Sequence, residues 1–587
     1  MRDRLSSRVD AALRSRVLGL LACALSFALV MLRIDAKSMW WDESLSLMRA
    51  QSDVATILSG HIRFGGLDTV DQHPPLYFLA LSAVTTLAGE SDLSLRLLSA
   101  LATVGVVAVT FALGRRLFGG RVAGMSAVFV ALSPLLVWYG QEIRMYALGT
   151  LLCSLTLYAA WRATTEGSWP WAAGAVIALA AAAATQYLTL LFTLCAVVIA
   201  GFAHHWRARR AHHPLIATRV SDPWRSGAMA VFIFLVALSV AYALLQRLPP
   251  SGVYADPPLS LGSMLVDLLN SYSLGLSVSL RDVWWIDAVF SLVWLAGIGA
   301  LLWPMLRRLP SGSSVSRTAR VALLVAAPLV PVIVVWLLTR RVAFYRNSRY
   351  VMFAAPLFSL GLAWALTRRR WAPARWLLAL GLLVTMGWSL QRYYVDPHYA
   401  TKEEYAGAVD YVTARELSGD LLIVHGPESQ AAVEHYYRGR LRLVSLPQAG
   451  TLNQLDEVLS ETISGYDRVW VIHGRCNFTD PDEQLTAWFE EHTYREMTTT
   501  FSSYAALVSV SLYDVADPFR RSATPGESLA TAGPARLVQA SGLTAQQPQG
   551  PLNTLGEEAT ALTVASGESL AARLTWVLDA PTPDLKL

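Results

Sequence analysis

This sequence is poor in charge, in cysteine and in lysine. Only 16% of its 587 residues are charged, against about 25% in soluble domains, which argues against a soluble multidomain protein. The four cysteines are scattered, and three of them (Cys23, Cys153 and Cys195) lie in apolar runs. Neither a disulfide framework nor a cysteine metal cluster is therefore indicated. The net charge of +5 comes mostly from arginines clustered between apolar segments, which is typical of cytoplasmic loops and not of a nucleic-acid-binding surface.

What the chain has in abundance is apolar sequence. Hydrophobic residues make up 54% of it, the mean hydropathy is +0.40 and there are 20 tryptophans, a profile typical of a polytopic membrane protein. The first apolar run, 17–34, follows five arginines and approaches the ~20 residues that a spanning helix needs. No small-residue cleavage site precedes Trp40. We therefore expect a retained first helix with a cytoplasmic N-terminus.

The arginine clusters decide whether the second apolar run, 74–89, crosses the membrane. If it crosses, the later clusters face outward, and if it lies along the interface, they are all cytoplasmic. These clusters lie at 115–121, 207–210, 307–320 and 368–375. The preference of arginine for cytoplasmic loops favours the interfacial position. The run is also short for a span, and it opens with two prolines, Pro74 and Pro75.

The sequence thus predicts about eleven spans, with the C-terminus outside the cell. The predicted spans lie near 17–34, 95–117, 121–139, 145–161, 171–187, 188–203, 227–247, 286–306, 321–338, 350–366 and 376–390. The loops on the outer face are then 35–94, 140–145, 248–285 and 339–349. We expect short helices along the membrane at Asp53–Ser59 and Pro74–Ala88.

Hydropathy falls after about residue 392, which predicts a change from membrane to soluble structure. The runs DLLIVH and RVWVIH predict strands, and the amphipathic segments around them predict helices, so we expect an extracytoplasmic α/β domain with a largely parallel sheet. The following segment is rich in Ser, Thr, Ala, Pro, Gly and Gln, which is typical of a linker. The predicted parts are a membrane module 1–395, the α/β domain 396–515, a linker 516–565 and an incomplete β-rich segment 566–587.

Four polar clusters lie in the loops that are predicted to face outward. They are Trp40-Trp41-Asp42-Glu43, Asp71-Gln72-His73-Pro74-Pro75-Leu76-Tyr77, Gln141-Glu142-Ile143-Arg144-Met145-Tyr146 and Arg349-Tyr350. Each alone has a structural explanation: a helix cap, a turn, an internal ion pair, or a snorkelling arginine. Charged groups are costly at a membrane edge, however, and all four clusters fall on one leaflet. Their coincidence favours a site for an anionic ligand.

Together these clusters resemble the C-type membrane glycosyltransferases of family 39, including the protein O-mannosyltransferases and the lipid A aminoarabinose transferases. The resemblance covers about residues 10–395 and is strongest in 38–160. The soluble domain resembles the variable outer domains of bacterial members and carries no diagnostic motif. One departure is Gln186-Tyr187, which stands where many relatives have a His-Tyr pair.

The resemblance implies an inverting transferase that moves a hexose or pentose from a polyprenyl-phosphate donor to an acceptor hydroxyl. Asp42 is then expected to act as general base, and Glu43 to orient it, bind a metal or cap a helix. Cations should stabilise the phosphate that leaves. Arg349 and Tyr350 are expected to act on the donor phosphate with help from Arg346. Glu142 and Arg144 are expected to position the donor or to orient Asp42, and Tyr146 to bind the substrate. His73 is expected to bind the acceptor or a metal, and the use of a divalent metal stays open.

Two other classes are compatible with the composition. A flippase or transporter for a polyprenyl-linked lipid would also place arginines outward, but it should show internal repeats, and none is evident. A non-catalytic scaffold of the cell envelope would not explain the acidic pair. The many arginines and alanines beside only three lysines are typical of a high-GC bacterium, so we expect a bacterial plasma membrane and an envelope lipid, glycan or protein as acceptor.

Overall fold

A computed structural model gives the fold of this chain. It describes residues 2–64, 67–166, 168–189, 259–306, 320, 322–339, 347–367, 372–400, 402–446, 455–474, 480, 483–502, 507–515, 530–532, 535–546, 552–554 and 569–578. The chain divides into two compact units, which we describe separately. The helical unit consists of Met1–Lys37, Ser46–Ile62 and Thr69–Ala400, and the α/β unit consists of Ser38–Leu45, Arg63–Asp68 and Thr401–Leu587.

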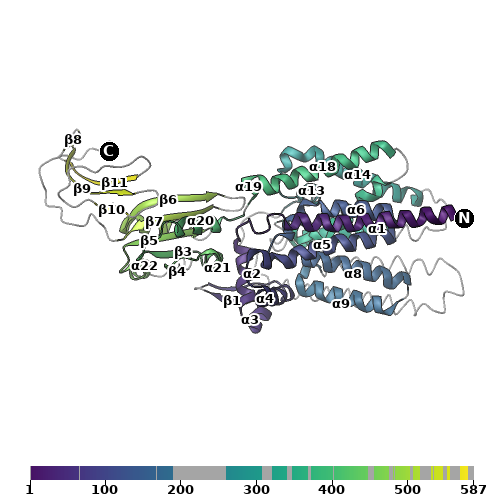
Figure 1. The fold of residues 1–587 in the computed structure, drawn as a ribbon, viewed down its shortest axis with the longest axis horizontal. Helices are drawn as coiled ribbons and strands as arrows, with labels where there is room; N and C mark the ends of the chain where they lie inside the picture. The colour runs from purple at the N-terminus through teal and green to yellow at the C-terminus, as the bar shows by residue number, and fades with distance from the viewer. Residues whose placement is uncertain are drawn as a thin grey trace. The chain divides into compact units, whose positions relative to one another are not determined.

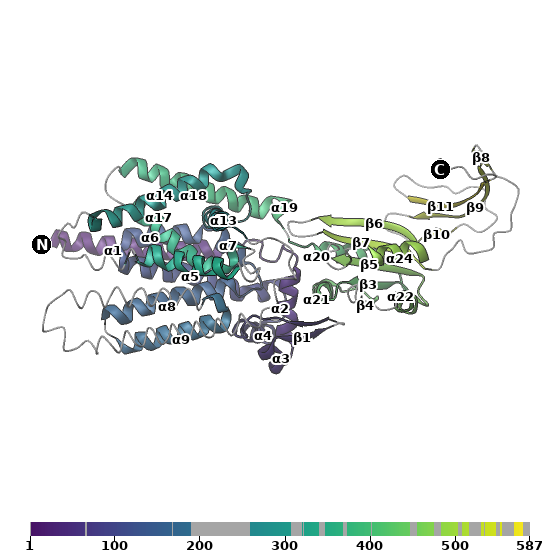
Figure 2. The same ribbon diagram turned by 180° about the vertical axis from the view of Figure 1, so that it is seen from behind.

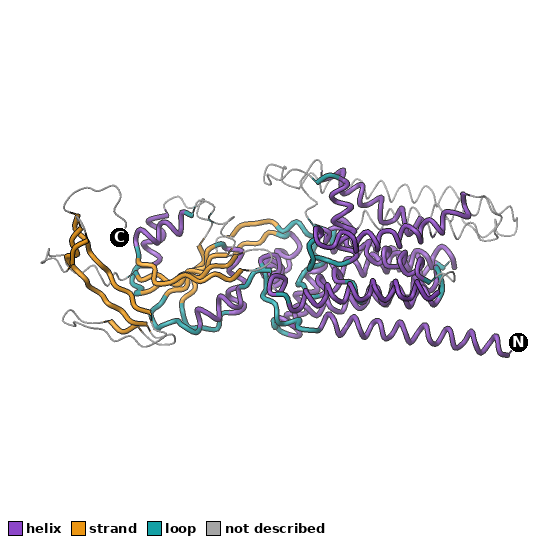
Figure 3. Tube along the Cα trace, turned by 90° about the horizontal axis from the view of Figure 1, so that it is seen from above, coloured by secondary structure: helices purple, strands orange, loops and turns teal. Residues whose placement is uncertain are grey.

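Helices dominate the first unit, as Figures 1 and 3 show. In chain order they are α1 (Arg2–Met31), α2 (Trp41–Gln51), α3 (Val54–Ser59), α4 (Leu76–Ala88), α5 (Asp92–Leu117), α6 (Gly120–Ala131), α7 (Pro134–Gly140), α8 (Tyr146–Glu166), α9 (Trp169–Thr185), α13 (Leu261–Ser273), α14 (Leu280–Leu306), the π-helix η2 (Ala322–Ala326), α16 (Ala327–Thr339), the 3₁₀ helix η3 (Ser348–Ala354), α17 (Ala355–Leu366), α18 (Ala372–Val395) and α19 (Pro397–Ala400). Helix α5 packs against α1, α6 and α8 (Figure 2).

Five helices in the described part of the chain are long and apolar enough to cross a membrane. They include α1, α5, α14 and α18, and η3 together with α17 forms the fifth. A sixth arises if α6 and α7, which bend by 56° at their junction, count as one span. The bend has a local cause, since the hydroxyl of Ser133 caps α7 and Pro134 opens it. The chain is therefore a polytopic helical membrane protein.

The predicted number of eleven spans stays a prediction. Two of the predicted runs, 188–203 and 227–247, lie largely or wholly outside the described residues. Two others correspond to helices too short to count as spans alone, α9 with 17 residues and α16 with 13.

The loop between α1 and α5 contains helices α2, α3 and α4 and a two-stranded sheet of β1 (His61–Phe64) and β2 (Leu67–Val70). Helices α3 and α4 lie where the sequence predicts short helices. Asp53 caps α3 by accepting a hydrogen bond from the backbone of Thr56. Helix α3 ends at Gly60, which has a φ of 75° and whose added Cβ would lie 2.2 Å from the carbonyl oxygen of Asp71. Only glycine fits this close approach of two backbones.

A five-stranded sheet forms the body of the α/β unit. Its strands are β3 (Leu421–His425), β4 (Arg442–Leu446), β5 (Arg468–Gly474), β6 (Tyr494–Ser502) and β7 (Leu507–Asp514), in the order β4-β3-β5-β7-β6. Strands β4, β3 and β5 are parallel, whereas β7 and β6 are antiparallel. The sheet is thus mixed, and the prediction of a largely parallel sheet holds for only three of its strands.

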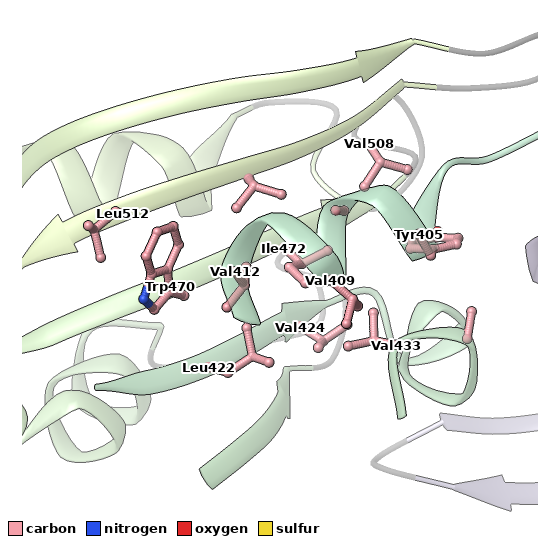
Figure 4. Packing of buried hydrophobic residues seen from close by; sticks show 13 residues of the cluster. Tyr405, Val409, Val412, Leu422, Val424, Val433, Trp470, Ile472, Val508 and Leu512 are labelled. Carbon is pink, nitrogen blue, oxygen red and sulfur yellow. The ribbon is translucent and has the colours of Figure 1, made fainter. Parts of the chain in front are cut away.

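Helices cover both faces of this sheet because its central strands are apolar on both sides. On one face, Leu422, Val424 and Trp470 pack against α20 (Tyr405–Thr413) and α21 (Pro427–Tyr436), as Figure 4 shows. On the other face, Leu421 and Val469 pack against α22 (Leu455–Ile463) and α24 (Gln484–His492). Buried parallel strands of this kind read as continuous apolar runs.

The C-terminal residues form a second, antiparallel sheet, of which the sequence predicts only the part within 566–587. Strand β9 (Ala535–Gln546) pairs with β8 (Ala530–Ala532), β10 (Leu552–Thr554) and β11 (Ser569–Leu578). Three of these strands fall inside the predicted linker 516–565, so that assignment needs correction. The composition misleads here because the strands are built from small and polar residues, and β9 finds its longest partner, β11, in the predicted β-rich segment 566–587.

Candidate active site

The acidic pair lies in the first turn of helix α2. Trp41 is its first residue, so Asp42 and Glu43 occupy the second and third positions. Oε2 of Glu43 accepts a hydrogen bond from the backbone N–H of Trp40 at 3.3 Å, which is one half of a capping box. Both side chains are buried, Asp42 at 8% and Glu43 at 2% exposure. Carboxylates at this end of a helix are stabilised by the helix dipole.

A second cluster is centred on an ion pair between Arg49 and Asp71. Nη1 of Arg49 lies 3.1 Å from Oδ2 of Asp71, and the same guanidinium donates to the carbonyl oxygens of Ile57 and His73 at 2.6 Å and 2.8 Å. Nδ1 of His73 lies 2.5 Å from Oδ1 of Asp71. One buried arginine thus joins α2, α3 and the loop that presents His73.

The charge of Asp71 is set by its neighbours. Burial alone would raise the pKa of its carboxyl, but His73, Arg144 and Arg49 together hold this pKa well below its usual value. Asp71 therefore stays ionised at neutral pH. Because the charge of Arg144 acts on the carboxyl of Asp71, the second and third polar clusters lie close together in the helical unit.

The third cluster occupies the junction between α7 and α8. Oε1 of Glu142 accepts a hydrogen bond from Nε1 of Trp138 at 2.8 Å. Nη1 of Arg144 donates to the hydroxyl of Ser46 in α2 at 3.0 Å. Arg144 and Tyr146 are buried, at 3% and 1% exposure. Glu142 thus contacts Trp138 of α7, and Arg144 contacts Ser46 of α2.

The fourth cluster lies in η3. Oδ1 of Asn347 accepts hydrogen bonds from the backbone of Arg349 and from the hydroxyl of Tyr139, both at 3.1 Å. The guanidinium of Arg349 lies 5.5 Å from the ring of Tyr146 and 5.3 Å from that of Tyr350. The two tyrosine rings are 6.5 Å apart and edge-on. Arg349, Tyr350 and Tyr146 therefore form one group, although about 200 residues separate them.

The sequence singles out two further positions. Arg346 lies outside the described residues. Gln186, which stands in place of a histidine expected from relatives, is 4% exposed and packs beside Gly149 of α8. Gly149 is three residues after Tyr146, so Gln186 lies about one turn of α8 from Tyr146, a member of the Arg349 group.

Sequence reasoning did not single out Arg49, although a signal was present. Arg49 is the only cation between Lys37 and Arg63, in a loop where other polar clusters gather. Among the residues that the structure describes, no group of three or more His, Cys, Asp or Glu side chains is arranged to hold a metal ion.

Comparisons with known proteins agree with the motifs. Residues 72–242 match the family described as dolichyl-phosphate-mannose-protein mannosyltransferase. No curated protein matches the chain. Among solved structures, ArnT from Cupriavidus metallidurans in the apo state has 15% sequence identity and a TM-score of 0.50, over 84% of this chain and 97% of that chain. The same protein bound to undecaprenyl phosphate has 14% identity and a TM-score of 0.50, over the same shares.

The solved structure of the Archaeoglobus fulgidus oligosaccharyltransferase also matches, with 10% identity and a TM-score of 0.45, over 95% of this chain and 75% of that chain. The likeness to ArnT extends across most of both chains, whereas the family match is confined to residues 72–242. The resemblance to the C-type membrane glycosyltransferases predicted from the motifs is confirmed, in sequence over residues 72–242 and in fold over most of the chain.

Proposed function

We propose that this chain is an inverting glycosyltransferase that moves a sugar from a polyprenyl-phosphate donor to a hydroxyl of an envelope lipid, glycan or protein. The observation that carries the proposal is the group formed by Arg349, Tyr350 and Tyr146 in the helical unit. A cation framed by two phenols suits a phosphate, because charge and hydroxyl donors can act on the same oxygens. The structural neighbour ArnT has been solved with undecaprenyl phosphate bound, which supports a donor of this class.

The reaction proposed is a single displacement at the anomeric carbon. The acceptor oxygen forms a bond to this carbon while the bond from carbon to the phosphate oxygen breaks, and the configuration inverts. The polyprenyl phosphate departs with the bonding electron pair, and the acceptor proton passes to Asp42. The leaving group is already an acidic phosphate, so no strong general acid is needed. Arg349 stabilises the charge that develops on it.

Asp42 suits the role of base better than Glu43. One carboxylate oxygen of Glu43 is engaged with the backbone of Trp40, which fits a helix-capping role. Asp42 also lies one helical turn before Ser46, the residue that accepts a hydrogen bond from Arg144. Side chains four residues apart share one face of a helix, so Asp42 and Ser46 lie on the same face of α2.

His73 is the proposed contact to the acceptor. Its side chain is 30% exposed, whereas that of its partner Asp71 is 7% exposed. One nitrogen of the imidazole therefore contacts the carboxylate of Asp71, while part of the ring stays exposed. A partly exposed ring suits recognition of a hydroxyl or polar acceptor. We place this site on the outer face of a bacterial plasma membrane, following the arginine distribution of the sequence.

A lipid flippase is the alternative that the test must exclude. Mass spectrometry of envelope lipids and glycans from a deletion strain should reveal a glycan or glycolipid that lacks one sugar, together with unused polyprenyl-phosphate sugar. A flippase mutant would instead accumulate an intact lipid-linked precursor on the inner leaflet. Purified protein incubated with undecaprenyl-phosphate sugars and extracted envelope acceptors should then restore the missing sugar. Absence of transfer with every such donor would refute the proposal.

A further inference from the structure

The segment that carries the acidic pair is held by the α/β domain. Ser38–Leu45 clusters with Thr401–Leu587 in one compact unit, although more than 350 residues of chain separate them. Three hydrogen bonds, each from a backbone N–H to a side-chain oxygen, join the two. The N–H of Trp41 donates to Oε2 of Glu403 at 2.9 Å, the N–H of Met39 donates to the hydroxyl of Tyr436 at 2.8 Å, and the hydroxyl of Ser38 accepts from the N–H of Ala406 at 3.0 Å.

Glu403 acts at the first residue of helix α2. The first backbone N–H groups of a helix have no partner within the helix. Glu43 satisfies the N–H of Trp40, and Glu403 satisfies that of Trp41. Glu403 is 1% exposed, and a buried carboxylate is costly unless it is well paired. The hydrogen bond from the N–H of Trp41 therefore gives this buried carboxylate a partner at the start of α2.

The neighbouring residue makes a matching contact. Nζ of Lys402 lies 3.9 Å from the centre of the Trp40 ring, within the range of a cation–π interaction. Two consecutive residues of the α/β domain thus hold two consecutive tryptophans, and Asp42 is the next residue. The ring of Trp40 and the backbone of Trp41 are thus both held at the point where the first turn of α2 begins.

We propose that the α/β domain positions the general base, with Glu403 as the positioning residue that fixes the first turn of α2 and thereby the carboxylate of Asp42. This inference rests on the proposed function. A solvated helix start needs no such partner, because water can satisfy its free N–H groups. A buried carboxylate at position 403 is expected where the carboxylate of Asp42 must be held in position to a fraction of an ångström. Glu403 itself need not touch the substrate.

The test compares Glu403→Ala with Glu404→Ala in the full-length protein. Glu404 is the matched control, since it is an adjacent carboxylate that caps α20 by accepting from the N–H of Gly407 at 3.1 Å. Glu403→Ala should lower kcat for sugar transfer ~10- to 100-fold, the loss expected when a catalytic group shifts by up to an ångström. KM for the polyprenyl-phosphate donor should stay within about twofold. Glu403→Gln should recover most of kcat, because its amide oxygen still accepts from Trp41.

Hydrogen exchange, measured on the same proteins, tests the contact between Glu403 and the start of α2 without depending on activity. Glu403→Ala should speed exchange in the peptide that contains residues 39–44, while the peptide of the core strand β5 stays protected. Glu404→Ala should leave 39–44 unchanged. A kcat for Glu403→Ala within about twofold of wild type, or an equal loss in Glu404→Ala, would overturn the inference. Wild-type protein that transfers no sugar would refute the proposed function instead, and exchange would still decide whether Glu403 holds α2.

Discussion

At the scale of single residues, the two adjacent acids have different surroundings. Glu43 is 2% exposed and accepts from the backbone of Trp40, whereas Asp42 is 8% exposed at the second position of α2. Capping needs only an oxygen at the third helical position, which a glutamine also supplies. Base catalysis needs a carboxylate that can gain a proton. Substitution by the matching amide should therefore separate the two roles.

We predict that Asp42→Asn lowers the rate of sugar transfer by ~10²- to 10⁴-fold, the usual contribution of general base catalysis. Glu43→Gln should retain a substantial part of the activity because it preserves the cap. Initial rates with a polyprenyl-phosphate sugar, measured for both variants at equal protein level, check this. Wild-type turnover in Asp42→Asn would show that another group takes the proton.

Arg349 is predicted to act on the donor phosphate. Arg349→Ala should raise KM for the donor and lower kcat, since a lost cation weakens both the bound phosphate and the developing charge on it. Arg392 provides a control, because its guanidinium also lies near two aromatic rings, those of Trp388 and Tyr399, at 5.8 Å and 5.4 Å. Steady-state kinetics should show a change of less than about twofold for Arg392→Ala. Equal kinetics for the two variants would remove Arg349 from the phosphate site.

At the scale of elements, Asp71 ties the outer loop together. Through Arg49 it connects the end of α2 to α3, and through its own carboxylate it holds the ring of His73. Three elements thus depend on one buried charge. Because neighbours hold the pKa of Asp71 below its usual value, its stabilising effect is present above the pKa of an unfolded aspartate, ~4, and is lost as the pH falls through the lower folded pKa.

Asp71→Asn should therefore destabilise the protein at neutral pH by roughly 3–5 kcal/mol, because Arg49 is left buried without its counter-charge. The difference from wild type should shrink as the pH falls below ~4, because the unfolded chain then takes up a proton at Asp71 while the folded carboxylate stays ionised down to its lower pKa. Thermal unfolding in detergent across this pH range measures both effects. A difference that is the same at every pH would mean that the charge of Asp71 does not stabilise the loop.

The sequence predicts some elements of this fold well because their signals are local. The apolar run of β3 and the capping aspartate of α3 are examples, since each element is encoded within a few residues. Strands β6 and β9 are missed because they contain many Thr, Ser and Ala residues and show no continuous apolar run. The candidate site likewise contains residues with a local sequence signal and residues without one.

For the site, residue types in the motifs are sufficient to select Asp42, Arg144 and Arg349 as candidates. They do not reveal Arg49, whose role appears only when Asp71 is brought to it by the fold. They also do not reveal Glu403, because no local pattern marks a carboxylate that caps a helix 362 residues away. Contacts between residues so far apart in the chain are created by tertiary packing and leave no periodic signal in the sequence.

At the scale of the whole molecule, the distribution of arginine is the strongest argument for orientation. If the segment of α4 lies along the interface, the junction of α5 and α6 is cytoplasmic and the residues after α18 are outside. If α4 crosses, both are reversed. Helix α4 has 13 residues, or about 20 Å at 1.5 Å per residue, which is less than the ~30 Å of a hydrocarbon core. Its length thus supports the interfacial position.

Reporter fusions decide between these two orientations. Alkaline phosphatase needs disulfides and is active only outside the cytoplasm, whereas green fluorescent protein reports cytoplasmic ends. We predict phosphatase activity for a fusion after Ala400 and none for a fusion after Gly119, with the opposite pattern of fluorescence. Because moving α4 across the membrane reverses both positions at once, the reversed pattern would place Asp42 and Arg349 on different faces. The proposed active site could not then exist, so this pair of fusions tests the orientation and the chemistry together.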